Sequence, residues 1–428
     1  MLDSIRIPQG STLQVTPEGL AMEGVLLADL ARQHGTPLFA YSQAAMAEAL
    51  AAYQRGLQGR RAQVFYAMKA NSNLAILQWF VRAGCGLDIV SGGELARALA
   101  AGCSPQRIIF SGVGKTRQEM REALKVGIAC FNVESLAELD TLNEVAVSLG
   151  VQAAISLRVN PDVDAQTHPY ISTGLKDNKF GIAHEDALSA YQRAQALPGL
   201  VVHGIDCHIG SQITQIAPYL DAMDKMLDLV QAVEASGIPL QHIDFGGGLG
   251  IDYNGDTPPQ ADALWTQLLA RIDARGLGDK ALFIEPGRSL IGNAGVCLTE
   301  VQYLKPGEHK NFCIVDAAMN DLPRPALYQA FHGILPTQAR ATPAQTWTIV
   351  GPVCESGDWI GRDRELAVAA GDVLAVASAG AYCMSMASNY NTRNRAKEVL
   401  IDGVQVHVIR ERESYADQWA LERPLPQA

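Results

Sequence analysis

The sequence predicts an α/β protein in which a (β/α)₈ barrel is combined with a second, β-sandwich-like domain. From Val64 onward, short apolar runs rich in β-branched residues alternate with longer segments of helical periodicity. After Arg288 the segments become short and strand-like, with turns between them and few long helices. The chain has 428 residues, 48% of them hydrophobic, which is enough for two packed domains.

The barrel is predicted from the number of strand–helix units. Strands separated by helices run parallel, because a crossover is needed to return to the same edge of the sheet. An open doubly wound sheet is the alternative, but a count of eight, with no dinucleotide fingerprint after the first strand, favours the closed barrel. The predicted strands begin at Val64, Leu87, Arg107, Ala129, Ala153, Val201, His242 and Ala281. The predicted helices between them include Leu74 to Gly84, Glu94 to Gly102 and Leu220 to Gly237.

The remaining segments predict the second domain. The first 36 residues also look strand-like and are expected to join it, so this domain is discontinuous in sequence. We therefore expect a barrel domain over residues 37–288 and a β-rich domain over residues 1–36 and 289–428. The predicted strands of the second domain are Val296 to Tyr303, Phe312 to Asp316, Trp347 to Val350, Val373 to Ala377 and Val399 to Val408.

The amino-acid composition argues against several classes of binding partner and location for this protein. There are 34 basic and 45 acidic residues, a net charge of −11, and no basic cluster, so neither nucleic acid nor an anionic membrane is expected as a partner. The eight cysteines are dispersed, without a C-x-x-C pair or zinc spacing, which indicates reduced thiols and no metal site. No signal peptide and no apolar run of the ~18 residues of a membrane span is visible. We therefore expect a cytoplasmic protein.

Unusual residues gather where the barrel strands end, which is where barrels place their active sites. Lys69 follows the first strand, His208 the sixth, the glycines Gly246–Gly248 the seventh, and Glu285 and Arg288 the eighth. Each alone has a structural explanation: a solvated lysine, a buried histidine or a simple glycine turn. Together, a lysine, a glycine-rich anion cradle and a carboxylate are what pyridoxal phosphate requires as its covalent partner, phosphate anchor and ring-nitrogen partner. A phosphorylated sugar on an aldolase-type lysine remains the alternative.

The same residues carry a family resemblance. The motifs resemble those of the alanine-racemase-like, fold-type-III pyridoxal-phosphate decarboxylases. The resemblance implies a barrel with a β domain, and a homodimer with active sites at its interface. The motifs are Tyr66-Ala-Met-Lys69-Ala-Asn, His208-Ile-Gly-Ser211, Gly246–Gly248, Glu285-Pro-Gly-Arg288, Cys354-Glu355-Ser-Gly-Asp358 and Gly380-Ala-Tyr382.

By this resemblance, one set of residues would bind pyridoxal phosphate. Lys69 would bond covalently to it, His208 would stack on its ring, and Glu285 would keep its ring nitrogen protonated. Its phosphate group would be held by Gly248, Gly287 and Arg288, with Ser211 nearby.

A second set would serve the substrate. Arg288, Arg324 and Tyr328 would grip a distal carboxylate, and Glu355 would bind a distal ammonium group. Tyr382 would touch both cofactor and substrate. Cys354, supplied by the partner subunit, would return a proton to the carbon that lost CO₂.

Further segments resemble the branch of the family that decarboxylates meso-diaminopimelate to lysine. They are the stretch from Asn160 to Gly174, Lys179-Phe-Gly, Asp321-Leu-Pro-Arg324 through Tyr328, and Ser388-Asn-Tyr390-Asn. Decarboxylases of ornithine, arginine or carboxynorspermidine, an amino-acid racemase and a non-catalytic cofactor-binding protein remain alternatives. Arg324 favours a substrate with a distal carboxylate, because a guanidinium pairs with one in bidentate fashion.

Overall fold

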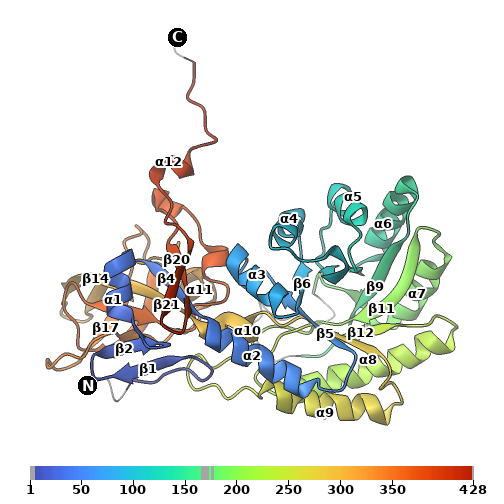
Figure 1. The fold of residues 1–428 in the computed structure, drawn as a ribbon, viewed down its shortest axis with the longest axis horizontal. Coiled ribbons are helices and arrows are strands. Elements are labelled where there is room, and N and C mark those ends of the chain that lie inside the picture. Colours follow the sequence, from blue (N-terminus) through green and yellow to red (C-terminus); the bar gives the residue numbers. More distant parts are fainter. Residues whose placement is uncertain (1–4, 165–172, 175–177, 427–428) are drawn as a thin grey trace. The chain divides into compact units, whose positions relative to one another are not determined.

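The computed structural model describes residues 5–164, 173–174 and 178–426 (Figure 1). The chain forms two compact units. One comprises Ala49–Ile251 and Thr257–Leu290, and the other comprises Met1–Glu48, Asp252–Asp256 and Ile291–Ala428. The domain boundaries suggested by the sequence differ in detail from this division and remain a proposal.

The first unit contains a closed barrel of eight parallel strands, which confirms the predicted fold class. The circle closes because β13 pairs with β5, with Phe283 opposite Gln63, and β8 pairs with β9, with Phe131 opposite Ile155. Around the circle the strands are β5 (Ala62–Ala67), β6 (Gly86–Ile89), β7 (Ile108–Phe110), β8 (Cys130–Val133), β9 (Ala153–Asn160), β11 (Leu200–Asp206), β12 (His242–Asp244) and β13 (Ala281–Ile284). A short strand, β10 (Ile182–Ala183), pairs in parallel with the last residues of β9.

Helices surround this barrel (Figure 1). They are α2 (Gln43–Gly56), α3 (Leu74–Arg82), α4 (Gly92–Ala100), α5 (Arg117–Val126), α6 (Leu136–Leu149), α7 (Ala187–Ala196), α8 (Ala217–Ala235), α9 (Ala261–Ala274) and α10 (Arg288–Ile291). Capping residues in the local sequence determine where several of these helices begin and end. Thr116 and Glu119 form a capping box at the start of α5, and Gly127 closes its end in the left-handed conformation.

The interior of the barrel separates into an apolar part and a polar part. Phe65, Ile109 and Cys130 form a buried cluster against the ring of Phe283. The carboxyl ends of the strands carry buried polar side chains instead, among them Asp88, Asp206 and Asp244. The apolar side chains stabilise the barrel, and the polar end is where chemistry is expected.

The second unit is mostly sheet. Its larger sheet runs in the order β18-β17-β15-β14-β4-β20-β21, and β19 pairs with β14 and β16. Its strands are β4 (Leu38–Ser42), β14 (Gly295–Lys305), β15 (Phe312–Val315), β16 (Ile334–Pro336), β17 (Gln345–Val350), β18 (Trp359–Leu366), β19 (Val373–Val376), β20 (Lys397–Asp402) and β21 (Gln405–Arg410). A small sheet contains β1 (Leu13–Thr16), β2 (Gly19–Met22) and β3 (Val25–Leu26), and the helices are α1 (Leu27–His34), α11 (Pro323–Tyr328) and α12 (Tyr415–Gln418).

Three details differ from the sequence-based prediction. Leu38–Ser42, which fell inside the expected barrel domain, pairs with β14 and β20 in the second unit. Leu27–His34, expected to be strand-like, forms a helix with an apolar buried side. The single strand predicted from Val399 to Val408 is a hairpin, because Gly403 reverses the chain with a positive φ of 61°.

Candidate active site

Lys69 lies immediately beyond the end of β5, and a carboxylate from the next strand holds its amine. Lys69 Nζ lies 2.8 Å from Asp88 Oδ2, and the Asp88 side chain is fully buried. The lysine side chain keeps 39% of its exposure, so its amine is accessible from the barrel mouth. An accessible amine anchored to a rigid strand end is suited to bonding with a carbonyl carbon. Asp88 was not among the residues predicted from the sequence to form the site.

The glycines after β12 form a backbone cradle. A side chain at Gly248, whose φ is +98°, would place its Cβ 2.3 Å from the carbonyl oxygen of Gly210, so only glycine fits there. Within the described part of the chain, nothing accepts a hydrogen bond from the backbone N–H of Gly248 or of Gly287. Arg288 Nη2 donates to Ser211 Oγ at 2.9 Å and adds a positive charge. Bare N–H groups beside a guanidinium fit a phosphate group.

His208 lies beside this cradle as a neutral imidazole. Its Nδ1 accepts a hydrogen bond from the N–H of Gly247 at 3.1 Å. Burial, helped by the charges of Arg158 and Lys69, lowers the pKa of His208 well below its usual value. A neutral aromatic ring in this position is suited to stacking on a planar cofactor.

Glu285 is a buried carboxyl group at the end of β13. Its Oε1 accepts hydrogen bonds from Asn132 Nδ2 at 3.1 Å and from Ser111 Oγ at 3.4 Å. Burial, followed by the charges of neighbouring carboxylates with Asp244 foremost, raises the pKa of Glu285 well above its usual range. A carboxyl with a raised pKa holds its proton more readily than an ordinary one, and it can share that proton with a basic nitrogen. The site therefore fits the pyridine nitrogen of pyridoxal phosphate as well as its phosphate.

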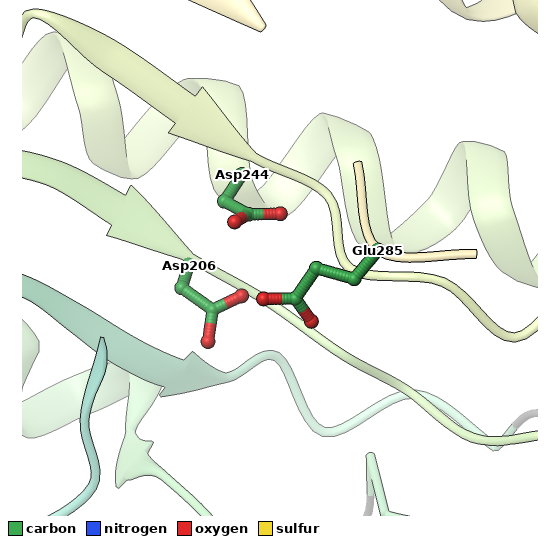
Figure 2. A group of neighbouring side chains, drawn as sticks. All are labelled: Asp206, Asp244 and Glu285. Atoms are coloured by element: carbon green, nitrogen blue, oxygen red, sulfur yellow. The ribbon is translucent and has the colours of Figure 1, made fainter. Parts of the chain in front are cut away.

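Two further acids, which sequence reasoning missed, face Glu285. Asp206 and Asp244 end β11 and β12, and a carboxylate oxygen of each lies within 4.8 Å of the others in the group (Figure 2). Burial and then Asp206 raise the pKa of Asp244 well above its usual value, and burial raises that of Asp206 to about 7. The nearest cation is Arg158, whose Nε is 4.0 Å from Asp206 and whose Nη1 is 2.8 Å from Glu134. The short distances among these three carboxyl groups do not by themselves indicate a metal site, because carboxyl groups that share protons can lie equally close together.

We predict that replacing Asp206 with asparagine stabilises the cofactor-free protein more at pH 8 than at pH 5. The folded protein keeps a proton on Asp206 up to about pH 7, whereas the unfolded chain releases it near the ordinary carboxyl pKa. Stability therefore falls as pH rises between these two values, and asparagine removes this loss. We expect a gain of about 2 kcal/mol at pH 8 in urea unfolding. An equal gain at both pH values would contradict the shifted pKa.

In the second unit, Arg324 on α11 is a buried cation, with 6% of its surface exposed. Its Nη1 lies 2.9 Å from His332 Nε2, and its guanidinium lies 4.7 Å from the ring centroid of Tyr253. Among the described residues, no carboxylate lies within 4.0 Å of it. A buried cation without an acidic partner is costly unless an anion binds to it. Tyr328, also expected to bind substrate, is half-buried at the end of the same helix.

Cys354 and Glu355 are exposed on a tightly bonded loop. Buried Asp358 holds the loop by accepting hydrogen bonds from the N–H of Val353 at 2.7 Å and of Met319 at 2.6 Å. The hydroxyl of Tyr390 donates to Glu355. The thiol and the carboxylate are therefore presented on a rigid support.

Tyr382 is half-buried and has a φ of 57°, a left-handed conformation rare for a bulky side chain. Such backbone strain is typical of functional positions.

The predicted site residues thus fall into two groups. The barrel unit brings together Lys69, His208, Ser211, Gly248, Glu285, Gly287 and Arg288, and the second unit carries Arg324, Tyr328, Cys354, Glu355 and Tyr382. Residues 165–172, within the segment from Asn160 to Gly174 that resembled the diaminopimelate branch, lie outside the described residues. Among the described residues, no helix is long and apolar enough to cross a membrane.

Comparisons with known proteins agree with the predicted fold and cofactor. Residues 43–292 match the pyridoxal binding domain of the pyridoxal-dependent decarboxylases. The chain is 54% identical to diaminopimelate decarboxylase from Vibrio cholerae, over 95% of this chain and 97% of that protein. The solved structure of diaminopimelate decarboxylase from Helicobacter pylori complexed with L-lysine matches with a TM-score of 0.88 and 41% identity, covering 92% of this chain and 98% of that one. That of M. jannaschii, in co-complex with L-lysine, matches with a TM-score of 0.92 and 38% identity, covering 97% and 99%.

The fold and the site therefore place this chain among the pyridoxal-dependent decarboxylases, with pyridoxal phosphate as its cofactor. Within that class, its likeness over nearly the full length of these relatives shows that it belongs to the diaminopimelate decarboxylase family.

Proposed function

We propose that the barrel mouth around Lys69 catalyses the decarboxylation of meso-2,6-diaminopimelate to L-lysine and CO₂. The enzyme is a pyridoxal-phosphate-dependent carboxy-lyase of lysine biosynthesis. When bound, the cofactor takes up the electron pair that the departing CO₂ leaves behind. The protein supplies the binding groups, the orientation and the protons.

Cofactor binding is assigned mainly to residues of the barrel unit. Lys69 bonds to the cofactor through its accessible amine. The N–H groups of Gly248 and Gly287, with Arg288 and nearby Ser211, hold the phosphate, and the neutral ring of His208 stacks on the cofactor ring. Tyr382 is assigned a contact with both cofactor and substrate.

Glu285 keeps a proton at the ring nitrogen. Its carboxyl is buried and its pKa is raised, which supports a proton shared between this carboxyl and the ring nitrogen. A protonated ring nitrogen would be stabilised by the carboxylate of Glu285, because opposite charges attract strongly in a buried site.

The observation that carries the choice of substrate is the buried guanidinium of Arg324, which no described carboxylate neutralises. A substrate with a second carboxylate, distant from the reacting carbon, supplies the missing anion. Arg288 and Tyr328 are assigned to the same carboxylate, and Glu355 to the distal ammonium group. Substrates that leave simple diamines, such as ornithine, lack this carboxylate.

Turnover of the purified protein with pyridoxal phosphate tests the assignment. Meso-diaminopimelate, L-ornithine, L-arginine and L-lysine are supplied separately, and CO₂ and the amine product are both measured. We expect CO₂ and L-lysine from diaminopimelate and at least about 10³-fold less turnover of the other three, since a buried guanidinium would be left unpaired. A preference for ornithine or arginine would keep the fold and the cofactor but overturn the substrate.

The active enzyme is proposed to be a homodimer in which Cys354 of one chain protonates the carbon in the site of the other. The thiol is exposed on its rigid loop rather than buried in its own unit, which supports a role toward a neighbouring chain. The S–H bond gives its proton to the carbon that lost CO₂, and the resulting thiolate regains a proton from water.

Mixing two inactive variants tests the shared site. In a hybrid of Lys69→Ala and Cys354→Ala chains, one site carries both changes and the other carries neither. We expect equal mixtures to recover about a quarter of the wild-type activity, as random exchange between dimers predicts. No recovery, with subunit exchange demonstrated by differently tagged chains, would show that each site is built from one chain.

The cellular location of the enzyme and its binding partners are proposed from its composition. The net charge of −11 disfavours nucleic acid and anionic membranes as partners, and a biosynthetic role fits the cytoplasm. The partners expected are a small amino-acid substrate and a second copy of the chain.

A further inference from the structure

His332 is a fully buried histidine with one defined hydrogen-bonding arrangement. Its Nδ1 lies 2.9 Å from the carbonyl oxygen of Ala377, and its Nε2 lies 2.9 Å from Arg324 Nη1. A carbonyl oxygen can only accept a hydrogen bond, so Nδ1 must carry the proton. A guanidinium nitrogen can only donate, so Nε2 must offer its lone pair. The two partners therefore fix both the tautomer and the orientation of the ring.

The guanidinium of Arg324 is held on a second side by an aromatic ring. The Tyr253 ring centroid lies 4.7 Å from the guanidinium carbon and 5.5 Å from the His332 ring, which it meets nearly edge-on at 81°. The backbone of His332 is itself tied down, since its carbonyl oxygen accepts a hydrogen bond from Arg364 Nη2 at 3.3 Å. Arg324 is thus directed by two neutral groups, neither of which cancels its charge.

We infer that His332 is a positioning residue for recognition of the distal carboxylate: its Nε2 lone pair, fixed by the Nδ1–H bond to Ala377, orients the guanidinium of Arg324 toward the substrate. This inference rests on the proposed function, in which Arg324 binds that carboxylate. The contact with His332 explains why the long, flexible side chain of Arg324 is already oriented to bind the distal carboxylate.

A neutral acceptor serves this purpose better than an acid. A carboxylate in place of His332 would neutralise Arg324 and compete with the substrate. An apolar residue would leave one guanidinium N–H without a partner and the side chain free to rotate. The imidazole fixes the direction of the guanidinium and leaves its charge available.

L-lysine and cadaverine provide the test, because they differ only in the carboxylate. Decarboxylation of diaminopimelate removes the carboxylate next to the reacting carbon, so the product L-lysine retains the distal one. Calorimetric titration of the holoenzyme with each compound therefore measures how much recognition of this carboxylate contributes to binding. We expect wild-type protein to bind L-lysine more tightly than cadaverine.

Two variants separate the two hydrogen bonds of His332. His332→Asn places an amide N–H near the position of Nδ1, keeps the bond to Ala377 and loses the acceptor for Arg324. His332→Gln reaches the position of Nε2 and keeps that acceptor. We expect the asparagine variant to lose about tenfold of its preference for L-lysine over cadaverine, and the glutamine variant to retain most of it. KM for diaminopimelate should rise about tenfold in the asparagine variant with little change in kcat, because the reacting carbon is distant.

Each outcome has a definite meaning. If wild-type protein did not prefer L-lysine to cadaverine, the assignment of Arg324 to the distal carboxylate would fail, and the proposed function with it. If the wild-type preference were present but unchanged in His332→Asn, the positioning role would be overturned while the function stood. Should the asparagine variant unfold, His332→Phe keeps the ring packing beside Tyr253 and removes the acceptor, and the same loss of preference is expected.

Discussion

Replacing Lys69 with alanine is expected to lower kcat by at least about 10³-fold, because the variant has no amine at this position that can bond to a carbonyl carbon. The glycine cradle and Arg288 do not depend on Lys69, so the variant should still bind pyridoxal phosphate, more weakly and without a covalent bond. Activity assays, together with the absorbance of the lysine-bound cofactor, measure the two effects separately.

Two further variants show which property of the lysine matters. Lys69→Arg retains a positive charge beside Asp88 but cannot bond to a carbonyl carbon, so it should be as inactive as the alanine variant. Asp88→Asn keeps the amine and removes its ion-pair partner, and a smaller loss is expected. Activity of Lys69→Ala within tenfold of wild type would refute covalent attachment at this residue.

The sequence predicted the barrel well because each strand–helix unit is a local pattern. The predicted strand beginning at Ala153 matches the first residue of β9, and the one beginning at Val64 lies two residues inside β5. The strand Leu38–Ser42 was missed because it stands alone between two helices. Its five buried residues acquire partners only when distant segments, β14 and β20, pack on both of its edges.

The site was predictable to a similar extent. Lys69, His208 and Glu285 lie at strand ends, and the order of the strands was enough to gather them. Asp206 and Asp244 carried a local signal, because each is an acid at the last position of its strand. Their convergence on Glu285, however, depends on the closure of the barrel, which brings neighbouring strand ends to one side.

His332 could not be singled out from the sequence at all. It lies eight residues beyond Arg324, and the two side chains meet because Gln329 turns the chain in the left-handed conformation, with a φ of 53°. Nothing in the spacing distinguishes it from an ordinary buried histidine. A contact across a turn is visible only in three dimensions.

Glu285→Gln is expected to change activity and stability in opposite directions. Glutamine can still accept a hydrogen bond from Asn132, but it cannot hold or share a proton with a ring nitrogen. We expect kcat at saturating cofactor to fall by about 10² to 10³-fold, which lies within the range typical of one positioned proton-transfer group. The cofactor-free variant should nevertheless be increasingly more stable than wild type as the pH rises, because it lacks one of three buried carboxyl groups within 4.8 Å of one another.

A loss of activity combined with a gain in stability is difficult to explain by general damage to the fold, because such damage lowers both. A melting temperature a few degrees higher, with kcat sharply reduced, would indicate a group kept for chemistry at a cost to the fold. Asp206→Asn is the matched control: it relieves the same crowding of acids, so it should stabilise the protein similarly while reducing kcat far less. If Glu285→Gln lowered stability as well as kcat, general damage would explain the loss and the proposed role of Glu285 would fail. If both variants reduced kcat equally, the catalytic proton would have to be assigned to the cluster as a whole rather than to Glu285.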